Sequence, residues 1–475
     1  MTDQAFRVAI VGAGFTGTML AVQLLRHVTR PLEITLIDNR GSFGRGLAYS
    51  ARNPRHVLNV RVANMSAFDD DPQHFIKWLW ANDTIYGESP GVPPSGHAFV
   101  SRATYGAYIE DVLREATRGA GSRAKVIQTV SEVLGAAAGT QGTRLALSDG
   151  RAVNADRVIL CVGNFPPAPR SRIDGPLAES NRYIADPWDE EAIDHVGPDD
   201  RVLVIGSGLT MVDMVIDLVA RGHRGTIRAV SRHGLLPHAH EQTQSYPPFL
   251  ERDRLPGDLL LMMQRIRGQM RLARAEKRDW RSVMDTMRPV VQALWQALSE
   301  SDRKRFLRHL RPYWDIHRHR MAPQIAQEIA SLRATGRLTV TAGRILEIGL
   351  DGDEVQLAYR SREDGHRQNM VADWIVNCSG PETDYSRIRH PLIQSLLASG
   401  QARPDKLALG LDLTDGFQLI GKTGLPTPNL YALGPPARGL LWESTAVPDI
   451  RKQCAHFAES LAASLADTPS PLPFR

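Results

Sequence analysis

The strongest constraint on the fold is a glycine-rich turn near the N-terminus. Residues 7–11 form an apolar, β-branched run, and Gly12-Ala13-Gly14-Phe15-Thr16-Gly17 leads directly from it into a helical pattern. In such a turn the chain bends sharply at the first glycine, a pyrophosphate approaches the backbone at the second, and the third lets helix and strand pack closely. A second strand, residues 33–37, ends in Asp38, where a carboxylate can accept hydrogen bonds from a ribose. This order predicts a dinucleotide-binding βαβ unit; an ordinary βαβ unit with convenient glycines is the alternative.

A similar turn occurs in the second half of the chain. Residues 201–205 resemble a buried strand, and Gly206-Ser207-Gly208-Leu209-Thr210-Met211 follows with Met211 in place of the third glycine. The next strand, residues 226–230, ends in Ser231-Arg232 instead of an acidic residue. An arginine at this place can hold a 2′-phosphate, whereas no carboxylate is present to repel it. We therefore expect an NAD(P)H site that includes Gly206, Gly208, Ser231 and Arg232, with NADPH favoured over NADH.

A repeated pattern indicates an internal duplication. Ala155-Asp156 precedes Cys161 and Gly163 at the same spacing with which Ala372-Asp373 precedes Cys378 and Gly380, each time after a hairpin-like stretch. About a hundred residues separate strand 226–230 from the next strand, at 338–341, which is more than a crossover needs. We therefore expect an α/β protein with two Rossmann-like domains and a largely helical insertion. Asp38 favours FAD at the first turn, as Arg232 favours NADPH at the second. The expected bounds are 1–165 and 381–465 for the FAD-binding domain, 198–380 for the NAD(P)-binding domain, about 245–325 for the insertion and 466–475 for a disordered tail.

Length and composition agree with an enzyme-sized globular protein. The 475 residues, 42% apolar and 23% charged, suffice for two or three domains. The apolar N-terminal run is too short for a signal peptide or a membrane span, so we expect a cytoplasmic protein without membrane association. Cys161, Cys378 and Cys454 are far apart and form no C-x-x-C, which argues against a disulfide framework, a metal site and a redox dithiol.

The net charge of +5 is concentrated in one segment. Residues 251–320 contain many more arginines and lysines than acidic residues. A solvated helix face is the commonest cause of such a run, and a contribution to holding anionic cofactors or substrates is the second interpretation. Nucleic-acid binding is the least favoured interpretation, and we expect none.

Two further stretches carry candidate site residues. Residues 41–49, behind the ribose-binding strand, include Gly44 and Gly46, which allow close backbone approach and so could wrap a cofactor; a surface Ω-loop is the alternative. His238, His240 and Arg438 are candidates for proton transfer or for binding an anionic substrate, although a structural role is the commoner fate of such residues.

Four motifs resemble a known class of proteins. They are Phe43-Gly44-Arg45-Gly46-Leu47-Ala48-Tyr49, Asn59-Val60-x-x-Ala63-Asn64-Met65-Ser66, Gly206-Ser207-Gly208-Leu209-Thr210-Met211-Val212-Asp213 and Gly434-Pro435-x-x-Arg438-Gly439-x-x-Trp442-Glu443. To about Ala466 the chain resembles the two-dinucleotide-domain flavoproteins, which include flavin-containing, Baeyer–Villiger and N-hydroxylating monooxygenases. It is most similar to a bacterial FAD/NAD(P)-binding family, one group of which is similar to FAD-dependent urate hydroxylases.

The resemblance implies where FAD would lie. It places FAD at Gly12, Gly14, Gly17 and Asp38, with Gly434 beside the ribityl-pyrophosphate. Asn59, Asn64 and Met65 would lie along the flavin ring. The N-terminus of the last helix, near Val447 and Pro448, would direct its positive end toward the reduced flavin. Pro435 stands where an Asp usually follows the glycine, which puts in question how the ribityl chain is held.

The resemblance also implies a reaction. Such monooxygenases consume NAD(P)H and oxygen and transfer an oxygen atom from a flavin C4a-hydroperoxide to a small-molecule substrate. The specific expectation is hydroxylation of a small anionic heterocycle, urate to 5-hydroxyisourate, with Arg438, His238 and Asn64 as candidate catalytic residues. Three alternatives stay open: an N-hydroxylating amine monooxygenase, an NAD(P)H:acceptor oxidoreductase and a non-catalytic flavin-binding protein. The oligomeric state is not predictable from these residues.

Overall fold

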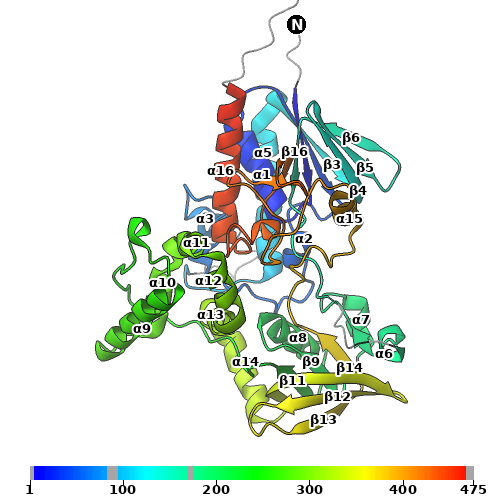
Figure 1. Cartoon of the computed structure of the whole chain (residues 1–475), viewed down its shortest axis with the longest axis vertical. Helices are drawn as coiled ribbons and strands as arrows, with labels where there is room; N and C mark the ends of the chain where they lie inside the picture. The colour runs from blue at the N-terminus through cyan, green and yellow to red at the C-terminus, as the bar shows by residue number, and fades with distance from the viewer. Residues whose placement is uncertain (1–4, 83–94, 169–172, 174, 467–475) are drawn as a thin grey trace, which may run out of the picture. The chain divides into compact units, whose positions relative to one another are not determined.

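The computed structural model describes residues 5–82, 95–168, 173 and 175–466, and the chain divides into two compact units (Figure 1). Unit 1 consists of Met1–Pro54, Arg61–Asn164 and Thr383–Arg475, and unit 2 of Arg55–Val60 and Phe165–Glu382. Each unit has its own parallel sheet, so the predicted α/β class is confirmed. Most of the predicted tail, residues 467–475, lies outside the described residues, and Ala466 is the last residue of a helix.

The main sheet of unit 1 has the strand order β15-β16-β7-β1-β2-β3. Strands β3, β2, β1, β7 and β16 run parallel, whereas β15 is antiparallel to β16. The second sheet is an antiparallel meander of β4, β5 and β6. The bounds are β1 Phe6–Val11, β2 Leu32–Asp38, β3 Ala124–Val130, β4 Val133–Gly139, β5 Gly142–Leu147, β6 Ala152–Ala155, β7 Arg157–Leu160, β15 Gln418–Ile420 and β16 Pro426–Ala432.

Helices α1 and α5 of unit 1 contact its main sheet, whereas α15 packs on β4 of the meander. The central helix α1 begins directly at the glycine turn, is buried along most of its length, and contacts both α5 and the last helix, α16. The bounds are α1 Phe15–His27, α2 Gly46–Tyr49, α3 His74–Ala81, α5 Arg102–Ala120, α15 Pro391–Ala398 and α16 Val447–Ala466. Short 3₁₀ turns cover Val62–Asn64, Gly121–Arg123 and Pro435–Ala437.

The sheet of unit 2 has the order β13-β12-β11-β10-β9-β14-β8. Its parallel part repeats the order of unit 1, because β11, β10, β9 and β14 correspond to β3, β2, β1 and β7. The bounds are β8 Tyr183–Ile184, β9 Val202–Ile205, β10 Ile227–Ser231, β11 Leu338–Asp351, β12 Glu354–Ser361, β13 Arg367–Ala372 and β14 Trp374–Asn377. Helices α6 Pro176–Glu179, α7 Glu190–Asp194, α8 Leu209–Ala220 and α14 Pro323–Ala334 complete this part.

The insertion between β10 and β11 is helical, as the sequence indicates. Its helices are α9 Leu259–Ala275, α10 Trp280–Thr286, α11 Val291–Ala297, α12 Glu300–Arg305 and α13 Arg311–Arg318, with 3₁₀ turns at Arg252–Arg254 and Arg288–Val290 and a π-helical turn at Phe306–Leu310. Helix α14, whose first residues fall within the predicted 245–325, is the crossover helix that packs on the sheet before β11. None of the helices in the described residues is both long and apolar enough to cross a bilayer.

The repeated Ala-Asp pattern has a structural cause in both units. Asp156 accepts hydrogen bonds from the backbone N–H and guanidinium of Arg7, at 2.8 and 3.0 Å. Asp373 binds Arg201 in the same way, at 2.7 and 2.6 Å. Each aspartate therefore fixes the start of the strand that leads into a glycine turn, and the predicted duplication extends to its ion pairs.

Candidate functional site

The first glycine turn lies between β1 and α1 in unit 1, and two of its glycines are required by packing. Gly12 has φ +101°, and a Cβ added there would lie 2.3 Å from the carbonyl oxygen of Cys161. A Cβ at Gly17 would lie 1.9 Å from the oxygen of Gly12. Neither position can hold a side chain without moving the backbone.

Gly14 differs from these two glycines. It is the N-cap of α1, has no side-chain cap and adopts extended backbone with φ −71°. A Cβ at Gly14 would be 3.5 Å from the nearest heavy atom, the Cα of Gly46, which is ordinary contact. The protein therefore does not itself require a glycine here, whereas a ligand bound at the N–H groups of the uncapped helix end would.

Asp38 ends β2 beside this turn. Its two carboxylate oxygens accept hydrogen bonds from the N–H groups of Ala13, at 3.1 Å, and Arg40, at 2.9 Å. A carboxylate can accept about four hydrogen bonds, so capacity for two hydroxyl groups remains. The contact with Ala13 also fixes the carboxylate to the glycine turn.

The stretch 41–49 packs on the glycine turn. The N–H of Gly44 donates to the oxygen of Ala13 at 2.9 Å, and a Cβ at Gly46 would lie 2.7 Å from the Cα of Gly14. Arg45 pairs with Glu110 through two hydrogen bonds of 2.6 and 2.8 Å. The glycines thus allow close approach to protein backbone, a packing partner that sequence alone did not reveal.

Gly434 follows β16 and meets the first turn of α1. Its φ is +76°, and a Cβ there would lie 2.6 Å from Oγ1 of Thr16. The N–H of Gly434 donates to Oε1 of Gln453 on α16 at 3.2 Å. Thr16 and Gln453 were missed by the sequence reasoning, because a single chain gives no signal that these residues meet.

Two buried polar groups near α16 have no hydrogen-bond partner within the described residues. They are the hydroxyl of Ser444, which is fully buried, and Nε2 of Gln453. Buried polar groups are nearly always paired, so each requires an explanation.

Arg438 lies in the turn that leads to α16. Its guanidinium is 4.7 Å from the ring centroid of Trp442, and α16 begins at Val447, next to the predicted Pro448. The positive end of this helix therefore belongs to unit 1, together with the first glycine turn.

Asn59, Asn64 and Met65 do not share one environment. Asn64 is exposed in the 3₁₀ turn Val62–Asn64, while the Met65 side chain is only 2% exposed; both residues belong to unit 1. Asn59 clusters with unit 2, where its carbonyl oxygen accepts a hydrogen bond from Nε2 of His240 at 3.0 Å.

The second glycine turn, in unit 2, repeats the first with one difference. Gly206 has φ +109°, and a Cβ there would lie 2.3 Å from the oxygen of Cys378. Gly208 is the N-cap of α8, has no side-chain cap, and has open space where its Cβ would be. Met211 replaces the third glycine and is fully buried in the core between sheet and helices.

Ser231 is the last residue of β10 and Arg232 follows it, and the two side chains have different surroundings. The hydroxyl of Ser231 shares a 2.8 Å hydrogen bond with Ser207 and accepts one from the N–H of Gly234 at 3.0 Å, so it ties the loop to the turn. Arg232 is exposed, and its side chain makes no hydrogen bond or ion pair to described residues. Next to it, burial and the charges of Arg362 and Arg232 lower the pKa of His233, which marks an electropositive spot.

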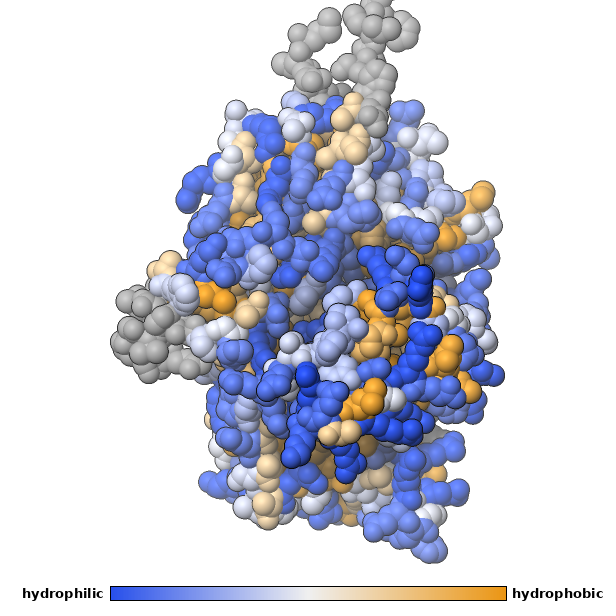
Figure 2. Space-filling model, turned by 90° about the vertical axis from the view of Figure 1, so that its left-hand side faces the viewer, coloured by the Kyte–Doolittle hydropathy of each residue, from blue (hydrophilic) through white to orange (hydrophobic). Residues whose placement is uncertain are grey.

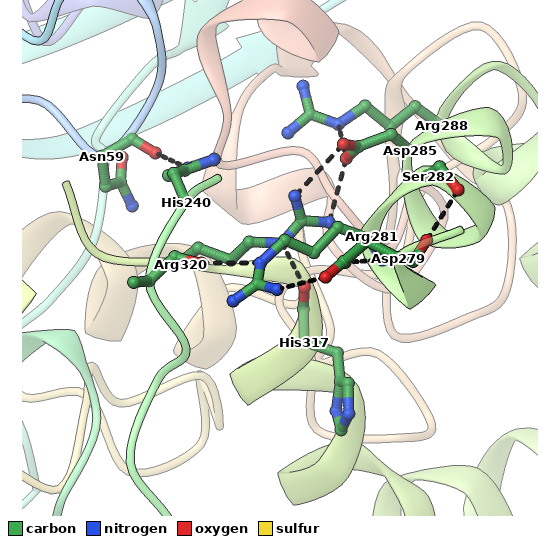
Figure 3. Close-up of polar contacts among 10 residues, drawn as sticks. Asn59, His240, Asp279, Arg281, Ser282, Asp285, Arg288, His317 and Arg320 are labelled. Carbon is green, nitrogen blue, oxygen red and sulfur yellow. Dashed lines mark hydrogen bonds and ion pairs between the residues drawn. The ribbon is translucent and has the colours of Figure 1, made fainter. Parts of the chain in front are cut away.

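Figure 3 shows a polar network in the insertion together with His240, and the ring of His238 lies beside His317 and Trp280 of the same region. Burial and the nearby His317 and arginines lower the pKa of His238, whose ring lies 5.0 Å from that of Trp280. Arg281 donates to the oxygen of Ala239 at 2.9 Å. This network holds the backbone of residues 238–240, a function that their side-chain types alone do not reveal.

Arg320 is the most buried charge of that network. Its guanidinium is about 1% exposed, forms two hydrogen bonds of 3.1 and 3.0 Å to Asp285, and donates to the oxygen of His317 at 2.8 Å. No group of three or more histidine, cysteine or acidic side chains in the described ranges could hold a metal ion.

Comparisons with known proteins agree with this architecture. A family model described as FAD-NAD(P)-binding matches residues 9–165. No curated protein sequence matches the chain. Among solved structures, reduced ornithine hydroxylase from Pseudomonas aeruginosa is 15% identical, with a TM-score of 0.64 over 97% of this chain and 100% of that one.

Two further solved structures are similar over nearly their whole length. Ornithine N-hydroxylase from Kutzneria sp. 744, with reduced FAD, NADP⁺ and L-ornithine, is 14% identical, with a TM-score of 0.64 over 97% of this chain and 100% of that one. L-lysine 6-monooxygenase from Pseudomonas syringae is 16% identical, with a TM-score of 0.62 over 98% and 99% of the two chains. At these identities the similarity establishes that this chain has the fold of the flavin-dependent N-hydroxylases.

Proposed function

We propose that this protein is an FAD-dependent monooxygenase that consumes NADPH, with FAD in unit 1 and NADPH in unit 2. The observation that carries the proposal is the pair of matching glycine turns. Gly14 and Gly208 are both helix N-caps without a side-chain cap and with room for a side chain. The position that would contact the ribose differs between the two turns: it is Asp38 in unit 1 and Arg232 in unit 2. Asp38 suits the free ribose hydroxyls of FAD, and Arg232, whose side chain has no partner among the described residues, suits a 2′-phosphate.

The residues of unit 1 fit FAD. The N-terminal N–H groups of α1 would bind the pyrophosphate, Asp38 the adenosine ribose, and the positive end of α16 the electron-rich edge of the flavin. The Ser444 hydroxyl and Nε2 of Gln453, which have no hydrogen-bond partner among the described residues, are buried near the start of α16 and could bind a polar cofactor. FAD, when bound and reduced by NADPH, supplies the activation of oxygen.

The substrate that the comparisons favour is a primary amine. The solved structures of similar fold are named as hydroxylases of ornithine and lysine, and the alignment with this chain covers nearly the whole length of each of them. The balanced reaction is R–NH₂ + O₂ + NADPH + H⁺ → R–NHOH + H₂O + NADP⁺. Urate, the specific expectation from the sequence motifs, gains no support from these comparisons, so N-hydroxylation becomes the leading hypothesis.

The test is a substrate panel with labelled oxygen. Purified protein containing FAD is mixed with NADPH and ¹⁸O₂, and with L-ornithine, L-lysine, cadaverine or urate. We expect an amine to accelerate NADPH oxidation and to yield a hydroxylamine that contains one labelled oxygen atom, detected by mass spectrometry. Labelled product from urate would instead support the original expectation.

Two other outcomes would overturn the proposal. Rapid NADPH oxidation with quinones or dyes, and no labelled product from any substrate, would indicate an acceptor oxidoreductase. Bound FAD that NADPH does not reduce would indicate a non-catalytic flavoprotein.

A further inference from the structure

Helix α9 presents an unusual face to solvent. Leu260, Leu261 and Leu272 are 66%, 43% and 54% exposed, although leucine is normally buried. The opposite side of the helix, which includes Leu259, Met262 and Ile266, packs into the insertion. The buried side of α9 therefore already holds the helix to the insertion, and the exposed leucines are not needed for this.

The same face carries an unbalanced positive charge. Arg265, Arg267, Arg271 and Arg274 are all exposed, and none of their side chains makes a hydrogen bond or an ion pair to described residues. The sequence from Leu259 to Ala275 contains no acidic residue. A helix face that is merely solvated usually mixes both signs of charge and has few leucines.

The leucines and arginines are spread over the exposed half of α9, with Leu260 about 100° from Leu261 around the axis and Leu272 about 16 Å from Leu261 along it. At 100° per residue, Leu261 and Leu272 lie within about 20° of each other, with Arg265 on one flank, while Leu260 lies between Arg267 and Arg271. Figure 2 looks onto the side of unit 2 that carries α9 and shows apolar side chains among strongly hydrophilic ones. The α9 face is defined here as these three leucines and four arginines.

We propose that the α9 face docks on the surface of an anionic lipid membrane, which departs from the expectation, drawn from the sequence, of no membrane association. Exposed leucines interspersed with arginines match acyl chains below a layer of phosphates, which guanidinium groups bind well. Each basic residue close to an anionic surface strengthens binding by about fivefold, so four arginines and three leucines suffice for reversible association. This proposal does not depend on the proposed reaction.

Two other occupants fit the face less well. A second copy of the chain would, in a symmetric contact, place the unpaired arginines of one copy against those of the other. A helical protein partner would contact Gly268 between Leu261 and Leu272, so the face offers it little apolar area. A stable interface typically buries about 1,000 Å² or more.

The experiment is vesicle co-sedimentation of the full-length protein containing its cofactor. Vesicles of phosphatidylcholine alone are compared with vesicles containing about 30% phosphatidylglycerol, chosen as the anionic lipid. We expect binding to the anionic vesicles at low salt, at least tenfold weaker binding to neutral vesicles, and progressive release as salt is raised.

Variants with matched controls locate the surface. Exchanging the four arginines for glutamine should weaken binding at least tenfold, and Leu260→Ser, Leu261→Ser and Leu272→Ser together should weaken it several-fold. The charge-matched control exchanges four exposed arginines outside the insertion that also lack partners among described residues: Arg118, Arg144, Arg333 and Arg360. The apolar control is Leu134→Ser with Leu425→Ser, at two other exposed leucines. Both controls should change binding less than twofold.

Three results would overturn the proposal. One is absence of binding to anionic vesicles at low salt. A second is equal loss of binding in the α9 and control variants. The third is that the leucine variants dissociate an oligomer in light-scattering measurements while vesicle binding is unchanged, which would assign the face to contacts between copies. Circular dichroism of each variant verifies that it is folded.

Discussion

Gly14→Ala separates cofactor binding from folding. The backbone at Gly14, φ −71° and ψ −167°, is accessible to any residue, and the new Cβ would be 3.5 Å from the nearest heavy atom. The stability of the protein without cofactor should therefore change by less than about 1 kcal/mol. In the complex the same methyl group would stand where the pyrophosphate approaches the helix end. Loss of one charge-assisted hydrogen bond costs about 1.5–3 kcal/mol, so FAD should bind about 10- to 150-fold more weakly. The larger Gly14→Val should abolish FAD binding.

Gly208→Ala is the matched control in unit 2. Gly208 caps α8 with φ −83° and ψ −168°, and nothing lies within 4 Å of the position of its Cβ. This variant should retain FAD, while its KM for NADPH rises over the same range. The measurements are FAD titration of the apoprotein, the NADPH dependence of flavin reduction, and urea unfolding. If Gly14→Ala binds FAD within twofold of the parent, or if Gly208→Ala loses FAD, the placement of the two nucleotides is refuted.

Other substitutions test the rest of the frame. Gly17→Ala should lower the free energy of unfolding by about 1–3 kcal/mol, seen as a lower urea midpoint, because its Cβ would lie 1.9 Å from the oxygen of Gly12; an unchanged midpoint would contradict the packing. Arg232→Ala should raise the KM for NADPH roughly tenfold or more and leave that for NADH within twofold, whereas Arg228→Ala, exposed on the same strand, should change neither; equal effects on both nucleotides would place Arg232 elsewhere. The hydrogen bonds from Arg201 lower the pKa of Asp373, so this carboxylate stabilises the fold above the pKa of about 3.9 that it has when unfolded, and the stabilisation is lost as pH falls through the lower folded value. Asp373→Asn should therefore destabilise the protein at pH 6. Below about pH 4 the free energy of unfolding, measured with urea, should depend less on pH than in the parent protein. An unchanged pH dependence would show that the Arg201–Asp373 pair contributes nothing.

The nucleotide-binding frame could be predicted from sequence because its signals are local. Gly12 and Gly206 each stand between an apolar strand and a helix, and both strands were placed within a residue of their observed bounds. The duplication was also visible, since each Ala-Asp repeat keeps one spacing. Its cause, the ion pairs Arg7–Asp156 and Arg201–Asp373, joins residues far apart in the chain and appears only in the structure.

The rest of the candidate site depends on long-range partners. Nothing near Gly46 in the sequence indicates that it packs on Gly14, and nothing near His240 indicates that it binds the carbonyl of Asn59. The strand at 338–341 was predicted too short, because β11 continues past its parallel partner to Asp351 and pairs there with β12. Local patterns give the strand's start, whereas its length depends on which neighbour it meets.

The difference between Gly17 and Met211 bears on how long each nucleotide stays bound. In unit 1 the helix approaches the turn so closely that any Cβ at Gly17 would collide with backbone, and Gly434 packs against the same first turn through Thr16. In unit 2 the buried Met211 side chain stands at the corresponding position, which requires a wider spacing between helix and turn. A site built on closely packed backbone loses little entropy when its ligand binds, and this favours slow release. We therefore expect FAD to remain bound through gel filtration while NADP⁺ is removed, with both measured by absorbance after denaturation. Loss of FAD with retention of NADP⁺ would mean that FAD dissociates faster than NADP⁺. The closeness of helix packing would then not determine how long each nucleotide stays bound.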